Sequence, residues 1–211
     1  MAECTFCDQF LSHKSHGICG EIFGSDFRRE IYEDKHFVVV AALGQIIEGC
    51  LLIIPRMHYY SISALPNQIQ DNFREITERV RERLRKDYGS AILLEHGSVT
   101  QMGCAGACIE HAHLHAVPIN IDIKSIVSTS FRPILIPSLK DLWSSPPNKD
   151  YLYYESTNSE CFLFEPEKPL PCQYFRRIVA AAIGCPNDWD WRTHIGTQKV
   201  RSVTKKLEGR I

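Results

Sequence analysis

The sequence lacks an excess of charge of either sign. Its 211 residues hold 24 Lys and Arg against 25 Asp and Glu, a formal net charge of −1. A protein that binds nucleic acid by general electrostatic attraction needs a basic surface, so nucleic acid is not an expected partner. The length, with an apolar content of 44%, is enough for one domain with a sizeable core.

Long apolar runs and targeting signals are lacking too. No stretch reaches the roughly 18–20 apolar residues that cross a bilayer. The first ten residues, MAECTFCDQF, have neither the basic start nor the apolar centre of a secretory signal. We therefore expect a cytoplasmic protein with no membrane partner. Internal repeats and low-complexity segments are also lacking, which favours one large domain or one domain with an appendage.

Cysteine, in contrast, is abundant, and its count of nine is odd. In the cytosol these residues are expected to be thiols, most of them small and buried and some of them metal ligands. Cys4 and Cys7 have the spacing of a metal-binding turn, but a second Cys-x-x-Cys or a His-x-x-x-His pair is missing downstream. A redox Cys-x-x-Cys would follow a strand and open a helix, which fits the N-terminal position less well.

Hydrophobic patterns predict an α+β domain. Continuous apolar strands are predicted over residues 36–43, 48–55 and 91–97. Apolar residues between the last two recur at steps of three and four, which predicts an amphipathic helix from Asn67 that ends at Gly89. Strands that flank one long helix with short connections favour a mostly antiparallel sheet of about five strands, with helices packed on one face.

The second half of the chain is less regular. Residues 119–150 are expected to be irregular, residues 151–156 and 161–166 to form a hairpin, and residues 172–184 to form a helix. The segment 198–210 carries several Lys and Arg and is interpreted as a solvated basic tail, with weak affinity for nucleic acid or phosphate as the alternative.

Three histidines occupy alternate positions in IEHAHLHAVP, residues 109–118: His111, His113 and His115. Alternation is typical of a strand, so the three rings are expected on one face. Chance polar residues on a half-buried strand are one explanation, and a three-histidine metal site is another. Same-face residues lie about 6.5–7 Å apart, whereas ligands of one zinc need nitrogens roughly 3–3.5 Å apart. A row of imidazoles that binds phosphate oxygens fits better, and the central one can attack phosphorus.

This stretch resembles the histidine triad (HIT) family, whose pattern His-φ-His-φ-His-φ-φ it matches at every position. Three other segments are similar, in the family's order: the strand LLIIPRMH, the small-residue loop Gly-Ala-Cys before the triad, and the N-terminal Cys-Thr-Phe-Cys of zinc-bearing members. The resemblance covers about residues 4–120. It implies a HIT-like fold, with residues 1–125 as the catalytic domain and residues 126–211 as a C-terminal extension packed on it, similar to that of a mainly microbial subgroup.

The resemblance implies a nucleotide-conjugate hydrolase that acts at the α-phosphorus through a covalent nucleotidyl-histidine. By position, His113 is the implied nucleophile, and His115 is implied to contact phosphoryl oxygens and the leaving group. Backbone N–H groups of Gly106, Ala107 and Cys108 are implied to bind the non-bridging oxygens. A nucleotidyltransferase or phosphorylase on the same fold, or a non-catalytic nucleotide-binding module, is the alternative.

In zinc-bearing relatives, two cysteines, the histidine after Ile-Pro and the first triad histidine bind one structural zinc. By position these are Cys4, Cys7, His58 and His111, a regular tetrahedral Cys₂His₂ set that includes the isolated Cys-x-x-Cys. Members often pair through the long helix and an edge strand, so a homodimer is a further expectation.

The sequence also departs from the family. Ala42 stands where many members carry an acidic residue that holds the ribose hydroxyls, so the resemblance supports phosphate chemistry but not the usual ribose contact. Other candidate substrate contacts are Glu95, at the end of a predicted strand, and Gln173 and Arg176, at the start of a predicted helix. The alternatives are a plain strand terminus for Glu95 and a solvated helix face for Arg176.

Overall fold

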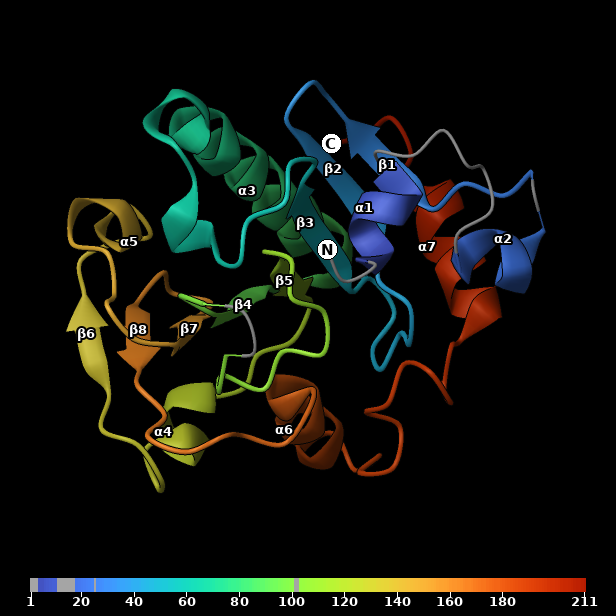
Figure 1. Ribbon diagram of the computed structural model, residues 1–211. Helices are drawn as coiled ribbons and strands as arrows, with labels where there is room; N and C mark the ends of the chain where they lie inside the picture. Colours follow the sequence, from blue (N-terminus) through green and yellow to red (C-terminus); the bar gives the residue numbers. More distant parts are fainter. Residues whose placement is uncertain (1–3, 11–17, 25, 101–102) are drawn as a thin grey trace.

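The computed structural model describes residues 4–10, 18–24, 26–100 and 103–211 (Figure 1). Its centre is an eight-stranded sheet in the order β1-β2-β3-β5-β4-β7-β8-β6, and every neighbouring pair is antiparallel. The strands are β1 (Glu30–Glu33), β2 (Phe37–Ala41), β3 (Leu51–Pro55), β4 (Ile92–Gly97), β5 (Leu114–Val117), β6 (Ile134–Ile136), β7 (Tyr151–Glu155) and β8 (Cys161–Phe164).

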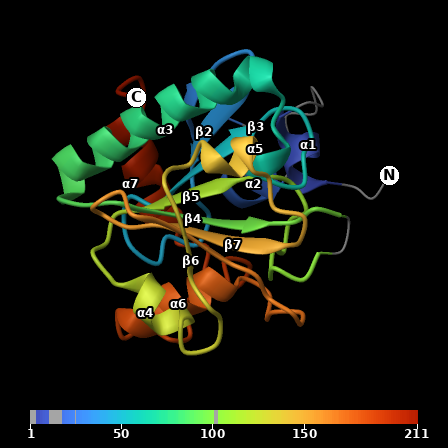
Figure 2. The same ribbon diagram turned by 90° about the vertical axis from the view of Figure 1, so that its left-hand side faces the viewer.

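Helices cover both faces of this sheet, as the edge-on view in Figure 2 shows. The helices are α1 (Thr5–Phe10), α2 (Ile18–Phe23), the 3-10 helix η1 (Ile62–Ala64), α3 (Asn67–Tyr88), α4 (Ile123–Val127), α5 (Asp141–Ser144), α6 (Tyr174–Ala182) and α7 (Thr197–Leu207). Buried residues of α2, α3, α5 and α7 share one core, and those of α1, α4 and α6 share the other. Among the described helices, none combines the length and the apolar character needed to cross a membrane.

The α+β class and the antiparallel sheet are confirmed, but two details of the prediction are wrong. The sheet has eight strands rather than about five, and its helices lie on both faces. The physical reason is visible in the sequence, because every residue of β2 and β3 is buried. A strand that is apolar on both of its faces must be covered on both sides.

The long helix α3 forms where its periodicity predicts it. Its apolar stripe from Ile69 to Leu84 lies in the core on one face of the sheet. The helix ends at Tyr88, and Gly89 follows with φ +88° while its N–H donates to the carbonyl of Arg85 at 2.9 Å. A left-handed residue that closes the last turn is the usual glycine stop of a helix.

The C-terminal half extends the same sheet. The predicted hairpin is present as β7 and β8, and β7 pairs with β4 in a register that sets Leu94 opposite Tyr154. The stretch expected to be irregular contains α4, β6 and α5. The boundary at residue 125 stays a prediction, but residues after it supply three of the eight strands.

The interpretation of the C-terminal segment as a solvated tail is wrong. Residues 197–207 form α7, whose Val200, Val203 and Leu207 are fully buried in the core that α3 also covers. Spacing of three and four residues between apolar positions is the helical signal, and it is partly hidden in the sequence by the Lys and Arg between them. The basic side chains lie on the outer face of a packed helix.

Candidate active site and metal centre

The triad lies at the centre of the sheet, where β5 runs between β3 and β4. His115 is within β5, and His111 and His113 directly precede it. The residues between the histidines pack in the core under α3, so the imidazoles leave from the opposite face, toward α1 and α6. The rings of His113 and His115 have centroids 4.8 Å apart.

His113 is held as a neutral ring of defined tautomer. Its Nδ1 lies 2.7 Å from the backbone oxygen of His111. A carbonyl only accepts, so the ring hydrogen is assigned to Nδ1, and the lone pair remains on Nε2. Burial lowers the pKa of His113 below 6.5, so near neutral pH the ring is an uncharged base with its lone pair available to a ligand.

A fourth histidine, His96 of β4, adjoins the triad. Its Nε2 accepts the backbone N–H of Phe175 at 3.2 Å, and its ring centroid is 6.1 Å from that of His115. Burial, with the charges of His113 and Arg176, lowers the pKa of His96 to about 3. The ring is therefore neutral, with its hydrogen assigned to Nδ1, where it can serve as a donor.

Glu95, a predicted substrate contact, lies away from this site. It accepts the backbone N–H of Ile62 and the hydroxyl of Tyr151, on the other face of the sheet. Burial raises the pKa of Glu95 to about 7. Neighbouring residues of a strand point to opposite faces, so His96 rather than Glu95 reaches the triad. The alternation of side chains along the strand predicted over residues 91–97 was the signal in the sequence that could have identified His96.

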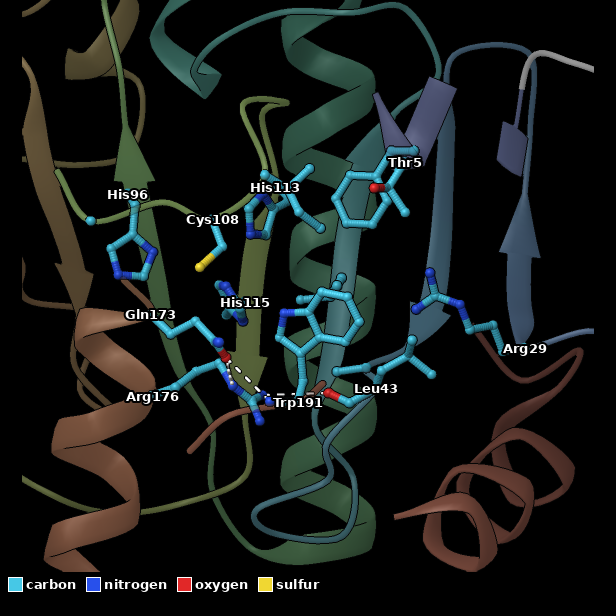
Figure 3. Close-up of a pocket in the computed structure, with 15 residues that line it drawn as sticks. Thr5, Arg29, Leu43, His96, Cys108, His113, His115, Gln173, Arg176 and Trp191 are labelled. Atoms are coloured by element: carbon cyan, nitrogen blue, oxygen red, sulfur yellow. Dashed lines mark hydrogen bonds between the residues drawn. The ribbon is translucent and has the colours of Figure 1, made fainter. Parts of the chain in front are cut away.

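These histidines line a pocket built by three distant parts of the chain (Figure 3). Helix α1 supplies Phe6, whose ring lies 5.5 Å from that of His113. The end of β2 and the C-terminal region supply the other walls. The lining residues are Thr5, Phe6, Arg29, Ala42, Leu43, Leu52, His96, Gly106, Cys108, Ile109, His113, His115, Gln173, Arg176 and Trp191.

The loop before the triad is fixed to the start of α6. Gly106 has φ +78°, and its carbonyl accepts the N–H of Gln173 at 2.8 Å. A Cβ at this position would lie 2.8 Å from the carbonyl oxygen of Pro171, so only glycine fits. Gly106 and Cys108 line the pocket, and Ala107 between them is half-buried.

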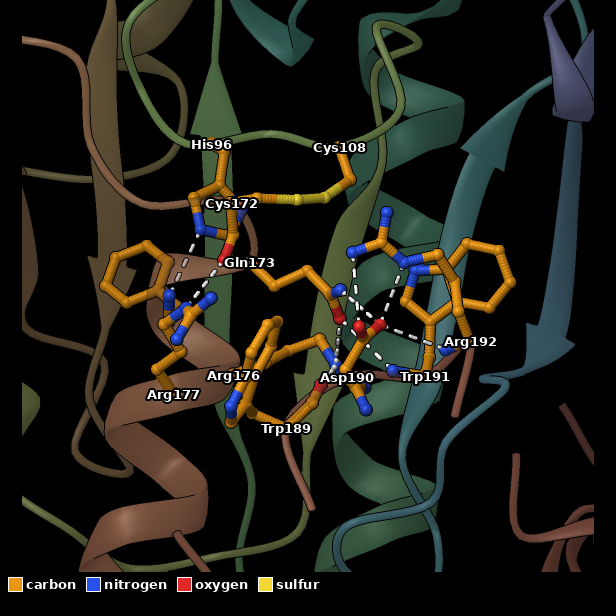
Figure 4. Close-up of a disulfide and its surroundings, with 11 residues drawn as sticks. His96, Cys108, Cys172, Gln173, Arg176, Arg177, Trp189, Asp190, Trp191 and Arg192 are labelled. Carbon is orange, nitrogen blue, oxygen red and sulfur yellow. Dashed lines mark hydrogen bonds and ion pairs between the residues drawn. A yellow bond between two sulfur atoms is a disulfide. The ribbon is translucent and has the colours of Figure 1, made fainter. Parts of the chain in front are cut away.

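A disulfide joins Cys108 to Cys172 across 64 residues, with their Cα atoms 5.5 Å apart (Figure 4). The expectation that all nine cysteines are thiols is therefore wrong for this pair. Sequence spacing could not reveal the bond, because only the packing of α6 against the loop brings the two residues together. Among the described residues, Cys4, Cys7, Cys19, Cys50, Cys104, Cys161 and Cys185 are free thiols.

Loss of this disulfide is expected to destabilise the fold. Cross-linking a loop of 64 residues restricts the unfolded chain by about 4 kcal/mol in the loop-entropy relation. Cys172→Ser should therefore lower the free energy of unfolding by up to about 4 kcal/mol, measured by urea unfolding without reductant. Cys185→Ser, at an exposed free thiol, is the matched control, and equal stability of the two variants would contradict the bond's role.

Gln173 and Arg176 both reach the pocket from the start of α6. Gln173, with φ +60°, donates to Asp190 at 2.9 Å and accepts from Nε of Arg176 at 3.1 Å. Arg176 extends toward the end of β2, where it donates to the carbonyl of Gly44 at 2.7 Å. Neither residue lies on a solvated helix face, since 4% of Gln173 and 8% of Arg176 is exposed.

The four residues of the predicted metal set come together at the end of the triad. The candidate ligand atoms of Cys4, Cys7, His58 and His111 all lie within 4.8 Å of one another. Nδ1 of His111 is 3.4 Å from Sγ of Cys4, and Nδ1 of His58 is 3.3 Å from Sγ of Cys7. Two sulfurs and two ring nitrogens converge from three separate segments, and together they could hold a metal ion.

The chemistry of these donors suits a cation. Nε2 of His111 donates to the carbonyl of Pro55 at 2.7 Å, which leaves the Nδ1 lone pair directed at the cysteines. Burial lowers the pKa of His111 to about 4, so the ring is neutral. Burial and contact with Cys4 raise the pKa of Cys7 to about 12. A divalent ion would supply the positive charge that two adjacent thiolates need.

Comparison with known proteins finds similarity over the segment that contains the triad. Residues 28–120 match the family model of the HIT domain. An uncharacterized HIT-like protein of Methanocaldococcus jannaschii is 28% identical over 102 residues, which are 47% of this chain and 75% of that protein. The crystal structure of a HIT family protein from Bacillus anthracis is 20% identical, with a TM-score of 0.43, and covers 59% of this chain and 86% of its own.

The structure of a zinc-bound histidine triad family protein from Mycobacterium smegmatis is 21% identical, with a TM-score of 0.39, and covers 50% of this chain and 76% of its own. The matched residues include the triad, β5 and the neighbouring strands β3 and β4. By this match, residues 28–120 are the part of the chain that is similar to the HIT domain family.

Proposed function

We propose that the protein hydrolyses a nucleotide conjugate at its α-phosphorus, with His113 as the nucleophile. The observation that carries the proposal is the fixed tautomer of His113 in the pocket wall. Its Nδ1 is committed to the carbonyl of His111, so Nε2 holds a lone pair that can attack phosphorus. A binding module would need no such base, whereas a nucleophilic imidazole must be neutral and oriented.

The reaction then proceeds in two balanced steps. Nε2 of His113 forms a bond to the α-phosphorus while the bond from phosphorus to the leaving group breaks. The leaving atom takes that electron pair and a proton from the ring of His115. Water next attacks the same phosphorus and gives a proton back to His115. The N–P bond breaks, its electrons return to Nε2, and a nucleoside monophosphate is released.

Neighbouring groups support both steps. The ring of His115 lies 4.8 Å from that of His113, centroid to centroid, and can hydrogen-bond the departing atom. Burial, with the charges of His113, His96 and Arg176, keeps the pKa of His115 well below 6.5. The ring therefore acts as a neutral donor or relay. Backbone N–H groups of the loop from Gly106 to Cys108 are our candidates for the non-bridging oxygens.

For the metal set we propose one structural Zn²⁺ held by Cys4, Cys7, His58 and His111. Two thiolates and two imidazoles are the donors that zinc prefers in closed tetrahedral sites. When bound, the ion would cross-link the N-terminal segment to the strand region that precedes the triad. Because Phe6 lies between the two cysteines and lines the pocket, the ion would also fix one wall of the substrate site.

The test of the proposed function is intact-protein mass spectrometry. The protein is mixed with nucleoside phosphoramidates, adenylyl sulfate, dinucleoside polyphosphates and nucleotide sugars, then quenched at alkaline pH. We expect a gain of one nucleotidyl mass on the wild type and none on His113→Ala. A substrate consumed without any adduct, with equal turnover by the variant, would contradict the covalent route. Products formed in the presence of phosphate separate hydrolysis from phosphorolysis.

A further inference from the structure

Two arginines are buried in the wall of the pocket. Arg29, before β1, is 2% exposed, and Arg176 of α6 is 8% exposed. A guanidinium stays charged in proteins, and removing it from water is costly without a counter-charge. The reaction proposed above uses neither group. Two buried cations in one pocket therefore need a separate explanation.

The partners of both arginines are neutral. Arg29 donates to the carbonyl of Ala41 at 3.1 Å and to the side chain of Gln9 at 2.7 Å, and its buried Nε has no hydrogen-bond partner. Arg176 donates to the side chain of Gln173 and to backbone carbonyls, among them that of Gly44. The ion pairs found among the described residues include neither arginine.

The carboxylate of Asp190, which acts on Arg176 electrostatically, is engaged elsewhere. Its oxygens bind Arg192 and the amide of Gln173. Arg192 lies on the exposed surface. The fifteen residues that line the pocket include no Asp or Glu. The charge of the two buried arginines is thus not cancelled inside the pocket.

Both arginines converge on one short segment. Arg29 binds the carbonyl of Ala41, and Arg176 binds that of Gly44, three residues later. The two arginines thus donate to carbonyls on either side of Ala42, in a segment that leaves β2 and turns at Gly44, where φ is +65°. Figure 3 shows Arg29, Leu43 and Trp191 away from His96, while the side chain of Arg176 extends from α6 toward Trp191.

This end of the pocket combines apolar and aromatic walls with positive charge. Phe6, Leu43 and Trp191 offer surfaces for a nucleoside. An anion bound among them would therefore be attached to the nucleoside rather than to the leaving group. We propose that the substrate carries a second phosphate, esterified to a ribose hydroxyl, and that Arg29 and Arg176 bind it. This inference rests on the proposed function and names the substrate class of the same pocket.

The test is a binding measurement that requires no turnover. Calorimetric titration of the metal-loaded protein compares the 5′-monophosphate, the 2′,5′- and 3′,5′-bisphosphates and the 5′-diphosphate of adenosine, and then of guanosine. We expect one bisphosphate to bind 10- to 100-fold more tightly than the monophosphate, the range for hydrogen bonds to charged groups. Equal affinity of bisphosphate and monophosphate would overturn the inference. A preference for the diphosphate over both bisphosphates would overturn the assignment to ribose.

Variants with matched controls distinguish a specific phosphate site from a general effect of positive charge. Arg29→Gln and Arg176→Gln should each reduce the advantage of the bisphosphate about tenfold, whereas Arg176→Lys, which keeps the charge, should retain part of it. The controls are Arg28→Gln and Arg177→Gln, one position away. The side chain of Arg28 is 67% exposed, and Arg177 stacks on Trp189. Controls that lose the advantage equally would refute the site.

The two proposals fail in different ways. Binding of the monophosphate without a preference for bisphosphates would leave the proposed function standing and remove only the ribose phosphate. Absence of binding by every nucleotide in both series would overturn both proposals.

Discussion

His113→Ala is expected to lower kcat by at least about a thousandfold, because loss of a covalent nucleophile removes the whole two-step route. The fold should persist, since the side chain lies at the pocket wall and 9% of the residue is exposed. Release of nucleoside monophosphate from the best substrate of the panel is the measurement, and circular dichroism verifies the fold. His36→Ala changes a histidine just before β2, outside the pocket lining, and should leave kcat unchanged.

The pH profile adds a second readout of the same group. Protonation of Nε2 would abolish attack, and burial places the pKa of His113 below 6.5. The acid limb of kcat/KM should therefore lie below pH 6.5, with activity level from there up to neutral pH. A folded His113→Ala protein with most of the wild-type rate, or a wild-type acid limb above neutrality, would refute the assigned role.

Loss of the metal is expected to damage stability and substrate binding together. The purified protein should contain about one zinc per chain, which the Cys4→Ser, Cys7→Ser double variant should lose. The free energy of unfolding should fall by several kcal/mol, because binding energy at such sites contributes directly to folding. KM should rise, since Thr5 and Phe6 between the two cysteines form part of the pocket wall.

Elemental analysis, thermal unfolding and steady-state kinetics on the same samples measure these effects. Cys185→Ser, at an exposed free cysteine, is the control and should keep the metal. A wild-type protein that is purified without metal and is as stable as the zinc-loaded form would remove the proposed site. An unchanged KM after metal loss would show that the metal is not needed to hold this wall of the pocket in place.

Local patterns predicted the elements that carry strong periodicity. The helix from Asn67 to Tyr88 and the buried strands β2, β3 and β4 follow from apolar spacing alone. The number of strands did not, because β1 and β6 are short and lie at the two edges of the sheet. Helix α7 was missed because the Lys and Arg of its outer face masked three buried apolar positions. The homodimer stays a prediction.

The residues of the site also differ in whether a local sequence pattern predicted their positions. Alternation of His111, His113 and His115 along the chain determined their common face, because side chains of extended backbone alternate between two faces. The disulfide between Cys108 and Cys172 and the burial of Arg29 had no local signal. Each depends on segments that meet only after the sheet is assembled.

By itself, the sequence determined the α+β class, the row of imidazoles and the spacing of cysteines and histidines that suits a metal. The tertiary structure decided which face Glu95 and His96 occupy, how α6 reaches the loop before the triad, and where Arg176 directs its charge. The physical reason is that periodicity is set by neighbours along one chain segment. The environment of a charge or a thiol is set by packing between segments that are distant in sequence.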